Sequence, residues 1–395
     1  MLPLENVKVV SFGQAVAGPY GGMMLADMGA DVVKIEPPGI GDHVRKWSRA
    51  DLHGHSPHFL SSNRNKRSIV IDLKKKAGVD LALDLIRRAD VLIENFTPGT
   101  MASLGLGYPE TSAVNPRLIY SSVSGYGQNG PYSDRSAYDL IIQGEGGLIS
   151  LTGTEDGQMA KVGVPVLDVM TAMVSAYSIV CALIERGGTG AGRYLDISML
   201  EVATSVMSYN LIDYAVSGKM SKPLGTRHPI LAPYQVYPTA TNPITVGVLA
   251  EPHWASFCEL IGREDLRDNP DYVVSQQRVV NLAALNRELM PIFASKPAEY
   301  WSREFRRRGL VCGDVNDVAG LLKHPQLKAR EYFQTFDLGG GTTVDIPGMP
   351  WRFAGANQPK HRPPELGEHT NQILADWLGM NETAIAEARR LGALG

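Results

Sequence analysis

The stretch VKVVSFGQAVAGPYGGMMLADMGADVVKIE, residues 7–36, decides the fold. Its apolar run at 7–12 is typical of a buried strand, and the loop at 13–22 that follows contains four glycines. A short helical segment with small residues then leads to a second apolar run at 31–36. Strand, turn, helix and strand in this order predict a parallel βαβ unit.

The same alternation continues along the chain. Strand-like runs occupy 67–73, 90–96 and 117–125, and a helical pattern fills 75–89. A long helix is expected from Asp168 to Gly187, followed by a strand at 194–200. The fold class is therefore α/β, with a Rossmann-like doubly wound sheet in a large domain at 1–224. Proline, threonine and short β-type runs after 222 predict a smaller α+β domain at 225–330 and a C-terminal segment at 331–395.

The composition is that of an ordinary globular protein. The 395 residues are 44% hydrophobic and carry a net charge of −3, which gives no general attraction to nucleic acid or to anionic membranes. The three cysteines show no CxxC spacing, so we expect reduced thiols and neither a disulfide framework nor a zinc site. The apolar stretch at 162–184 contains Pro165 and Asp168 and suits a buried helix better than a bilayer span. We expect a soluble cytoplasmic protein without a signal peptide.

Three motifs have both a chemical and a plainer interpretation. The loop at 13–22 lacks the GxGxxG spacing of nicotinamide enzymes, so we expect its backbone to approach a different phosphate-bearing ligand. A solvated loop explains the histidines better than a metal site does, and the basic residues suit a solvated face or a cationic rim for phosphates equally well. The histidines are His53, His55 and His58, and the basic residues are Arg64, Lys66, Arg67, Lys74, Lys75 and Lys76.

Asp168 precedes an apolar helix. Its plainer role is that of an N-cap, the commonest reason for aspartate at such a position. Its chemical role uses the same place, because a helix N-terminus favours an anion and an ionised carboxylate is a competent nucleophile for covalent catalysis. The residues alone leave both roles open.

A series of ordered motifs resembles the class III CoA-transferases of the formyl-CoA transferase and carnitine CoA-transferase type. The motifs are AGPYGGMMLADMGADVVKIE (17–36), NRNKRSIVIDLK (63–74), ADVLIENFTPGTMASLGL (89–106), AYDLIIQGEGGL (137–148), GVPVLDVMTAMVSAYSIVCAL (163–183) and GRYLDISMLE (192–201). The resemblance implies a large domain built from both ends of the chain, with 331–395 returning to it, and an interlocked homodimer. It also implies that Asp168 is the nucleophile and that acyl-CoA and a carboxylic acid are substrates. No permanently bound cofactor and no metal are expected.

By position, the resemblance places the coenzyme A contacts on residues in four segments. They are Val16, Ala17, Ile71, Asp72, Leu73, Lys74, Asn95, Phe96, Arg135 and Tyr138. Where the formyl-CoA enzyme has glycines, this chain has Arg227 and His228, which could hold the distal carboxylate of a C4 or C5 dicarboxylate. Succinyl-CoA is the expected donor. Alternatives are an α-methylacyl-CoA racemase-like epimerase, although Tyr138 replaces the racemase histidine, and a non-catalytic CoA-binding protein.

Overall fold

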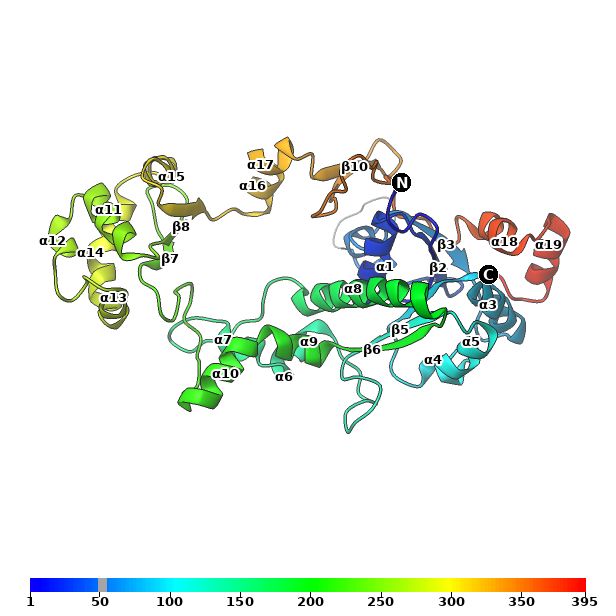
Figure 1. Cartoon of the computed structure of the whole chain (residues 1–395). Helices are drawn as coiled ribbons and strands as arrows, with labels where there is room; N and C mark the ends of the chain where they lie inside the picture. The colour runs from blue at the N-terminus through cyan, green and yellow to red at the C-terminus, as the bar shows by residue number, and fades with distance from the viewer. Residues whose placement is uncertain (49–54) are drawn as a thin grey trace. The chain divides into compact units, whose positions relative to one another are not determined.

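Six parallel strands form the central sheet. They are β1 (Lys8–Ser11), β2 (Asp31–Glu36), β3 (Lys66–Val70), β4 (Val91–Glu94), β5 (Ile119–Ser124) and β6 (Arg193–Ser198). Their order is β3-β2-β1-β4-β5-β6, and every neighbouring pair is parallel (Figure 1). This is the strand order of a doubly wound dinucleotide-binding sheet, with the order reversing between β1 and β4. The prediction of an α/β fold around a parallel sheet is confirmed.

Both faces of this sheet are buried. Val9 and Val10 are adjacent in β1 and fully buried, yet they belong to different apolar clusters because successive side chains of a strand point to opposite faces. All residues of β4 and β5 are buried, so neither strand alternates between a buried face and an exposed face.

Helices cover the two faces in separate layers. Leu85 and Ile373, from the third helix and from the C-terminal segment, pack on the face of Val10. Leu25 and Ile179 pack on the face of Val9. The helices up to residue 217 are α1 (Ala17–Asp27), η1 (His43–Lys46), α2 (Pro57–Leu60), α3 (Lys76–Arg88), α4 (Thr100–Ser103), α5 (Tyr108–Val114), α6 (Asp139–Glu145), α7 (Leu148–Leu151), α8 (Val166–Thr189), α9 (Met199–Val206) and α10 (Ser208–Ser217).

The long helix α8 lies against α1 and the sheet. A Cβ added to Gly21 of α1 would approach the Ala172 carbonyl oxygen to 3.2 Å, so glycine permits this close packing. Ala176 and Ile179 face the sheet and are buried. By length and composition alone α8 could cross a bilayer, and it is the one helix in the described part of the chain for which this holds.

The computed structural model describes residues 1–48 and 55–395, so His53 lies outside the described residues. The chain separates into two units, the first containing Met1–Leu148, Lys161–Lys219 and Ala329–Gly395. The second contains Ile149–Ala160 and Met220–Lys328. The segment 149–160, which the sequence analysis placed in the large domain, groups with the second unit. This segment forms a turn bridged at Gly153 and Met159, and the Gly225 N–H donates to the Gly153 carbonyl oxygen.

The second unit is built from a three-stranded antiparallel sheet and short helices. Its core is rich in aromatic side chains, with Phe293 between Tyr237 and Trp301. The elements are β7 (Tyr234–Tyr237), β8 (Ile244–Gly247), α11 (Glu251–Ile261), α12 (Glu264–Arg267), α13 (Ser275–Val280), α14 (Leu282–Ala294), α15 (Ala298–Arg307), β9 (Val311–Asp314), α16 (Val318–Leu322) and α17 (Pro325–Ala329).

The C-terminal segment contributes to the first unit. It contains the hairpin of β10 (Phe333–Asp337) and β11 (Thr343–Pro347), then α18 (Thr370–Leu378) and α19 (Glu382–Arg390). The His369 N–H donates to the Ser68 carbonyl oxygen, and Leu394 forms a β-bridge with Ile71. The end of the chain therefore completes the edge of the sheet beside β3.

Candidate active site

A cavity of about 220 Å³ opens at the carboxyl ends of β1, β4 and β5. Ligands of open α/β sheets bind at this edge, where the strand order reverses. Its walls bring together seven of the residues predicted from the sequence: Asp168, Val16, Ala17, Asn95, Phe96, Arg135 and Tyr138. Side chains that are more than 150 positions apart in the chain therefore meet in one place.

A second cavity, of about 380 Å³, contains the remaining predicted segment. Ile71, Asp72, Leu73 and Lys74 line it. Gln14 and Phe96 line both cavities. A ligand with two ends can therefore lie along this edge of the sheet with Phe96 beside its middle.

Asp168 does not cap its helix. Helix α8 begins at Val166 after the N-cap residue Pro165, so Asp168 lies within the first turn and the N-cap interpretation was wrong. Two effects oppose the stabilisation of the anion that is expected at a helix N-terminus. Burial, and then repulsion by Asp139, raises the pKa of Asp168 to about 7.

Asp139 occupies the helix terminus in its place. Its Oδ1 accepts hydrogen bonds from the Leu167 N–H at 2.8 Å and the Asp168 N–H at 3.4 Å. Its Oδ2 accepts from Gln143 Nε2 at 2.5 Å. The sequence analysis missed Asp139, although it directly follows Tyr138 in the AYD string.

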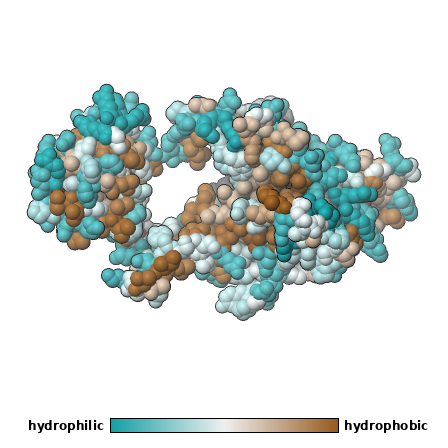
Figure 2. All heavy atoms as spheres, viewed as in Figure 1, coloured by the Kyte–Doolittle hydropathy of each residue, from teal (hydrophilic) through white to brown (hydrophobic). Residues whose placement is uncertain are grey.

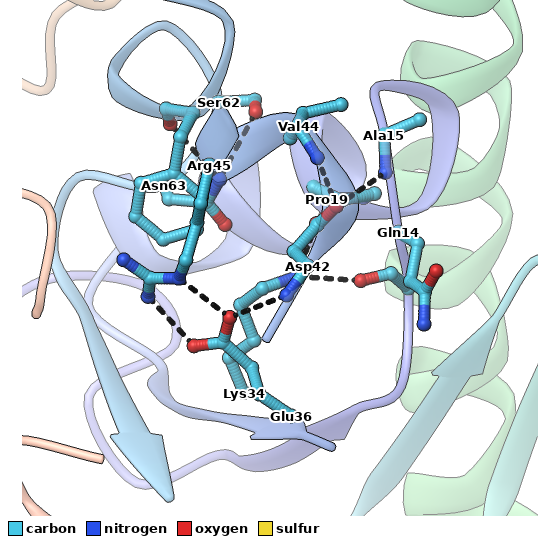
Figure 3. Close-up of polar contacts among 12 residues, drawn as sticks. Gln14, Ala15, Pro19, Lys34, Glu36, Asp42, Val44, Arg45, Ser62 and Asn63 are labelled. Atoms are coloured by element: carbon cyan, nitrogen blue, oxygen red, sulfur yellow. Dashed lines mark hydrogen bonds and ion pairs between the residues drawn. The ribbon is translucent and has the colours of Figure 1, made fainter. Parts of the chain in front are cut away.

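Buried polar side chains stabilise the conformation of the loop after β1, as Figure 3 shows. Ala15 has a positive φ of 58°, a conformation that costs an L-residue about 1–2 kcal/mol. Asp42 Oδ1 accepts the Ala15 N–H at 3.2 Å, and Asp42 Oδ2 lies 2.9 Å from Lys34 Nζ. Lys34 also donates to the Gly13 carbonyl oxygen at 2.6 Å. A buried ion pair thus braces two points of the loop that lines the cavity.

The loop is also tied to the next strand of the sheet. The Gln14 N–H donates to Asn95 Oδ1 at 2.8 Å, and Asn95 Nδ2 donates to the Gln14 carbonyl oxygen at 3.0 Å. A Cβ on Gly18 would come within 2.8 Å of Asn95 Oδ1. Gly18 is therefore required by the packing of the protein on itself, and not only by the approach of a ligand.

The basic residues at the start of β3 and just before it, Arg64, Lys66 and Arg67, bind other groups of the protein. Arg64 forms a buried ion pair with Asp27, and Arg67 pairs with Asp31. Lys66 is buried, donates to three oxygen acceptors, and has a pKa lowered well below its usual range by burial. None of these three residues lines the cavity of Asp168 or the cavity of Ile71–Lys74. Lys74, which is exposed, lines the cavity of Ile71–Lys74, whereas Lys66 and Arg67 line a separate cavity beside Asn357–Arg362.

The metal hypothesis has no support among the described residues. No group of three His, Cys, Asp or Glu side chains there could hold a metal ion. His55 lies 3.4 Å from Glu365, and His58 contacts the Trp47 carbonyl oxygen.

The model of CoA-transferase family III matches residues 4–370 of the chain. The chain belongs to this family. It is thus an enzyme that transfers coenzyme A between carboxylic acids. Human succinyl-CoA:glutarate CoA-transferase is 32% identical to it, over 99% of this chain and 90% of the relative.

Two further likenesses have higher sequence identity. Succinate–glutarate CoA-transferase of Agrobacterium fabrum is 35% identical to this transferase, over 97% of both chains. A crystal structure of a CAIB/BAIF family protein from Brucella suis has a TM-score of 0.86 and 35% identity, covering 95% of this chain and 99% of that one.

In the transferase, Arg227 and His228 belong to the second unit. Arg227 Nε lies 2.8 Å from Glu155 Oε1. His228 Nδ1 accepts from the Ile230 N–H at 3.2 Å, and its ring contacts Tyr234 edge-on. The role of Arg227 and His228 in substrate binding remains a prediction, and any role for Arg227 must compete with Glu155.

Proposed function

We propose that the enzyme transfers coenzyme A from succinyl-CoA to a C4 or C5 dicarboxylate, with Asp168 as covalent nucleophile. The observation that carries this proposal is the position of Asp168 in a cavity at the switch point of the sheet, continuous in its lining with a second cavity. We infer that the nucleotide end of coenzyme A occupies the cavity of Ile71–Lys74 and that the thioester enters the cavity of Asp168.

The chemistry proceeds through four acyl exchanges. An Asp168 carboxylate oxygen attacks the thioester carbonyl, the C–S bond breaks, and a mixed anhydride and CoA thiolate form. The thiolate attacks the aspartyl carbonyl and releases succinate, leaving an aspartyl-CoA thioester. The acceptor carboxylate displaces the thiolate to form a second anhydride. Attack of the thiolate on the acceptor carbonyl then yields the new CoA ester and restores Asp168. Each step conserves the activated acyl bond, which avoids one concerted and difficult exchange.

The surroundings of Asp168 suit this task. A carboxylate that is half-buried and poorly stabilised as an anion is more basic, and a more basic carboxylate is a stronger nucleophile. Attack requires the ionised form. We therefore expect the rate with succinyl-CoA to rise with pH up to about 7 and then level off.

The dicarboxylate assignment rests on the relatives and on one cation. Both curated relatives described above are glutarate CoA-transferases by name, and glutarate is a C5 dicarboxylate. Arg227 offers a guanidinium that could exchange Glu155 for the distal carboxylate of a substrate, because the Glu155 side chain is 57% exposed.

We also propose that the enzyme is an interlocked homodimer. Helix α10 buries none of its residues, although it contains Leu211, Ile212 and Tyr214. Helix α8 exposes Tyr177 and Ile184. Figure 2 shows apolar residues gathered over both helices. A second copy of the chain would cover these faces. Sedimentation at nanomolar concentration should give twice the chain mass, and a folded monomer would contradict the arrangement.

The nucleophile is tested by trapping the covalent intermediate. Trypsin cleavage after Lys161 and Arg186 releases the peptide 162–186, in which Asp168 is the sole aspartate and Glu185 the sole glutamate. Incubation with succinyl-CoA and hydroxylamine should convert Asp168 to a hydroxamate, read by mass spectrometry of this peptide. Asp168→Asn should abolish the hydroxamate and reduce transfer by about 10³-fold or more.

Glu185→Gln is the matched control, because it removes the other carboxylate of the same peptide and leaves the cavity untouched. It should retain the hydroxamate and the activity. Transfer by Asp168→Asn at a rate near that of the wild type would refute the proposal.

A further inference from the structure

Asp139 replaces a cap that the nucleophile's helix lacks. The N-cap residue of α8 is Pro165, whose side chain has no acceptor, so the first backbone N–H groups of the helix need a partner from elsewhere. Asp139, the first residue of α6, supplies it from 28 positions away through its bond to the Leu167 N–H. The Asp139 side chain is therefore held by the turn that carries the nucleophile.

The other carboxylate oxygen is held just as firmly. Oδ2 accepts from Gln143 Nε2, and Gln143 Oε1 accepts from the Val162 N–H at 2.8 Å. A carboxylate only accepts and a backbone N–H only donates, so these two partners dictate which way the Gln143 amide points. Gln143 is completely buried. Asp139 and Gln143 together hold the backbone at both ends of the segment from Val162 to Asp168.

The charge of Asp139 is not neutralised by a neighbour. Among the described residues, no lysine, arginine or histidine forms an ion pair with it, and it is 8% exposed. The titratable groups that share the cavity with Asp168 are His43, Arg135 and Tyr138. The Arg135 guanidinium lies over the Tyr132 ring, 3.6 Å from its centroid, and His43 Nδ1 contacts Gln14 Oε1 at 3.1 Å. The buried charge nearest the Asp168 backbone is thus that of Asp139.

Two carboxylates therefore compete for one helix terminus, and Asp139 takes it. The N–H groups and the positive end of the helix dipole stabilise an anion within the first turn. Asp139 accepts even the N–H of Asp168 itself. The Asp168 carboxylate lies in the same turn but accepts neither of these two N–H groups, and it faces the like charge of Asp139. Its anion is therefore less stabilised and a stronger nucleophile.

We propose that Asp139 is a positioning residue that fixes the first turn of α8 and, by its charge, keeps Asp168 a strong nucleophile. This inference rests on the proposed role of Asp168. Asp139 does not react with the substrate. It acts through the backbone of residues 167 and 168 and through the field at the Asp168 carboxylate.

The variant Asp139→Asn separates charge from shape. The side-chain amide oxygen can still accept from Leu167, but the negative charge is gone. Without the repulsion, Asp168 should ionise at lower pH, so the acidic limb of kcat/KM for succinyl-CoA should move down by about one pH unit. At pH 8 the plateau should fall by about two- to tenfold, because a less basic carboxylate is a weaker nucleophile.

Gln143→Met serves as the control. It loosens the support of Asp139 and leaves the charge in place, so it should lower kcat without moving the acidic limb. Asp139→Ser is a second uncharged variant, with a hydroxyl that suits a helix cap, and keeps the test available if the asparagine variant does not fold. An acidic limb that stays at the wild-type pH in folded Asp139→Asn or Asp139→Ser would overturn the inference.

The two proposals fail in different ways. If wild-type enzyme forms no hydroxamate on Asp168, the proposed nucleophile is wrong. If the hydroxamate forms in the wild type and in Asp139→Asn, and the acidic limb does not move, only the role of Asp139 is wrong.

Discussion

Removing one member of the Lys34–Asp42 ion pair should destabilise the first unit and distort the cavity loop. The two side chains are 1% and 0% exposed, with Nζ and Oδ2 2.9 Å apart. Lys34→Met leaves Asp42 with the N–H groups of Ala15 and Val44, each at 3.2 Å, and with the more distant, partly exposed His43, whose Nδ1 lies 3.7 Å from Asp42 Oδ1. In Asp42→Asn only one of the two side-chain atoms is an oxygen. If this oxygen accepts from the Ala15 N–H, the amide NH₂ faces the Lys34 ammonium; if it faces Lys34, the Ala15 N–H loses its acceptor.

The expected loss of stability follows from the burial of the Lys34–Asp42 pair. Removing one partner of a buried pair leaves an uncompensated charge and costs about 3–5 kcal/mol. Replacing both partners removes that charge, so Lys34→Met/Asp42→Asn should cost less than the sum of the single changes by about 2 kcal/mol or more. Ala15→Gly is the matched control in the same loop. It relieves a positive φ and should leave stability unchanged or raise it by up to about 1 kcal/mol.

Two measurements test this prediction. Thermal unfolding at one protein concentration should show that the Tm of each single variant is lower by roughly 10 °C, since each kcal/mol lowers the Tm of a large domain by about 2–4 °C. Hydrogen exchange of peptides that contain Ala15 and Val44 should accelerate in both single variants, because the acceptor of these amides is disturbed. Losses below about 1 kcal/mol for both single variants, or strictly additive losses in the double variant, would show that the pair does not brace the loop.

Two other predictions concern the nucleophile and the substrate. Because the folded-state pKa of Asp168 is raised to about 7, its ionisation opposes folding increasingly as pH rises from about 4 to 7 and by a constant amount above that. Asp168→Asn should therefore gain Tm over the wild type progressively across that pH range, and a gain independent of pH would contradict the raised pKa. Arg227→Ala should impair transfer to glutarate about tenfold more than transfer to a monocarboxylate of similar length, since an unpaired distal carboxylate is costly to bury. Equal losses on both acids, measured as kcat/KM, would remove Arg227 from the substrate site.

The sequence determined the sheet and most of its functional edge. Apolar runs such as 7–12 and 31–36 predict strands because a strand buried on both faces shows no polar alternation. The long connection between these two runs contains a helical segment, and such a crossover favours parallel pairing. The loops after those strands then had to meet at the carboxyl edge. That Val16, Asn95 and Asp168 serve a common ligand was implied by the resemblance to the class III CoA-transferases, and the positions of Val16 and Asn95 agree with this edge of the sheet.

Only the tertiary structure decided which polar groups meet within that edge. Lys34 in the middle of a buried strand signals a hidden partner, but nothing local identifies it as Asp42 or places the Gly13 carbonyl oxygen beside it. Likewise, the start of α8 at Val166 removed Asp168 from the cap position and gave the helix terminus to Asp139. Hydrophobic periodicity reflects neighbours along the chain, whereas the partner of a buried charge depends on packing between distant segments. Burial, and then the charge of Asp139 from a distant part of the chain, raises the pKa of the proposed nucleophile, and the sequence pattern records neither effect.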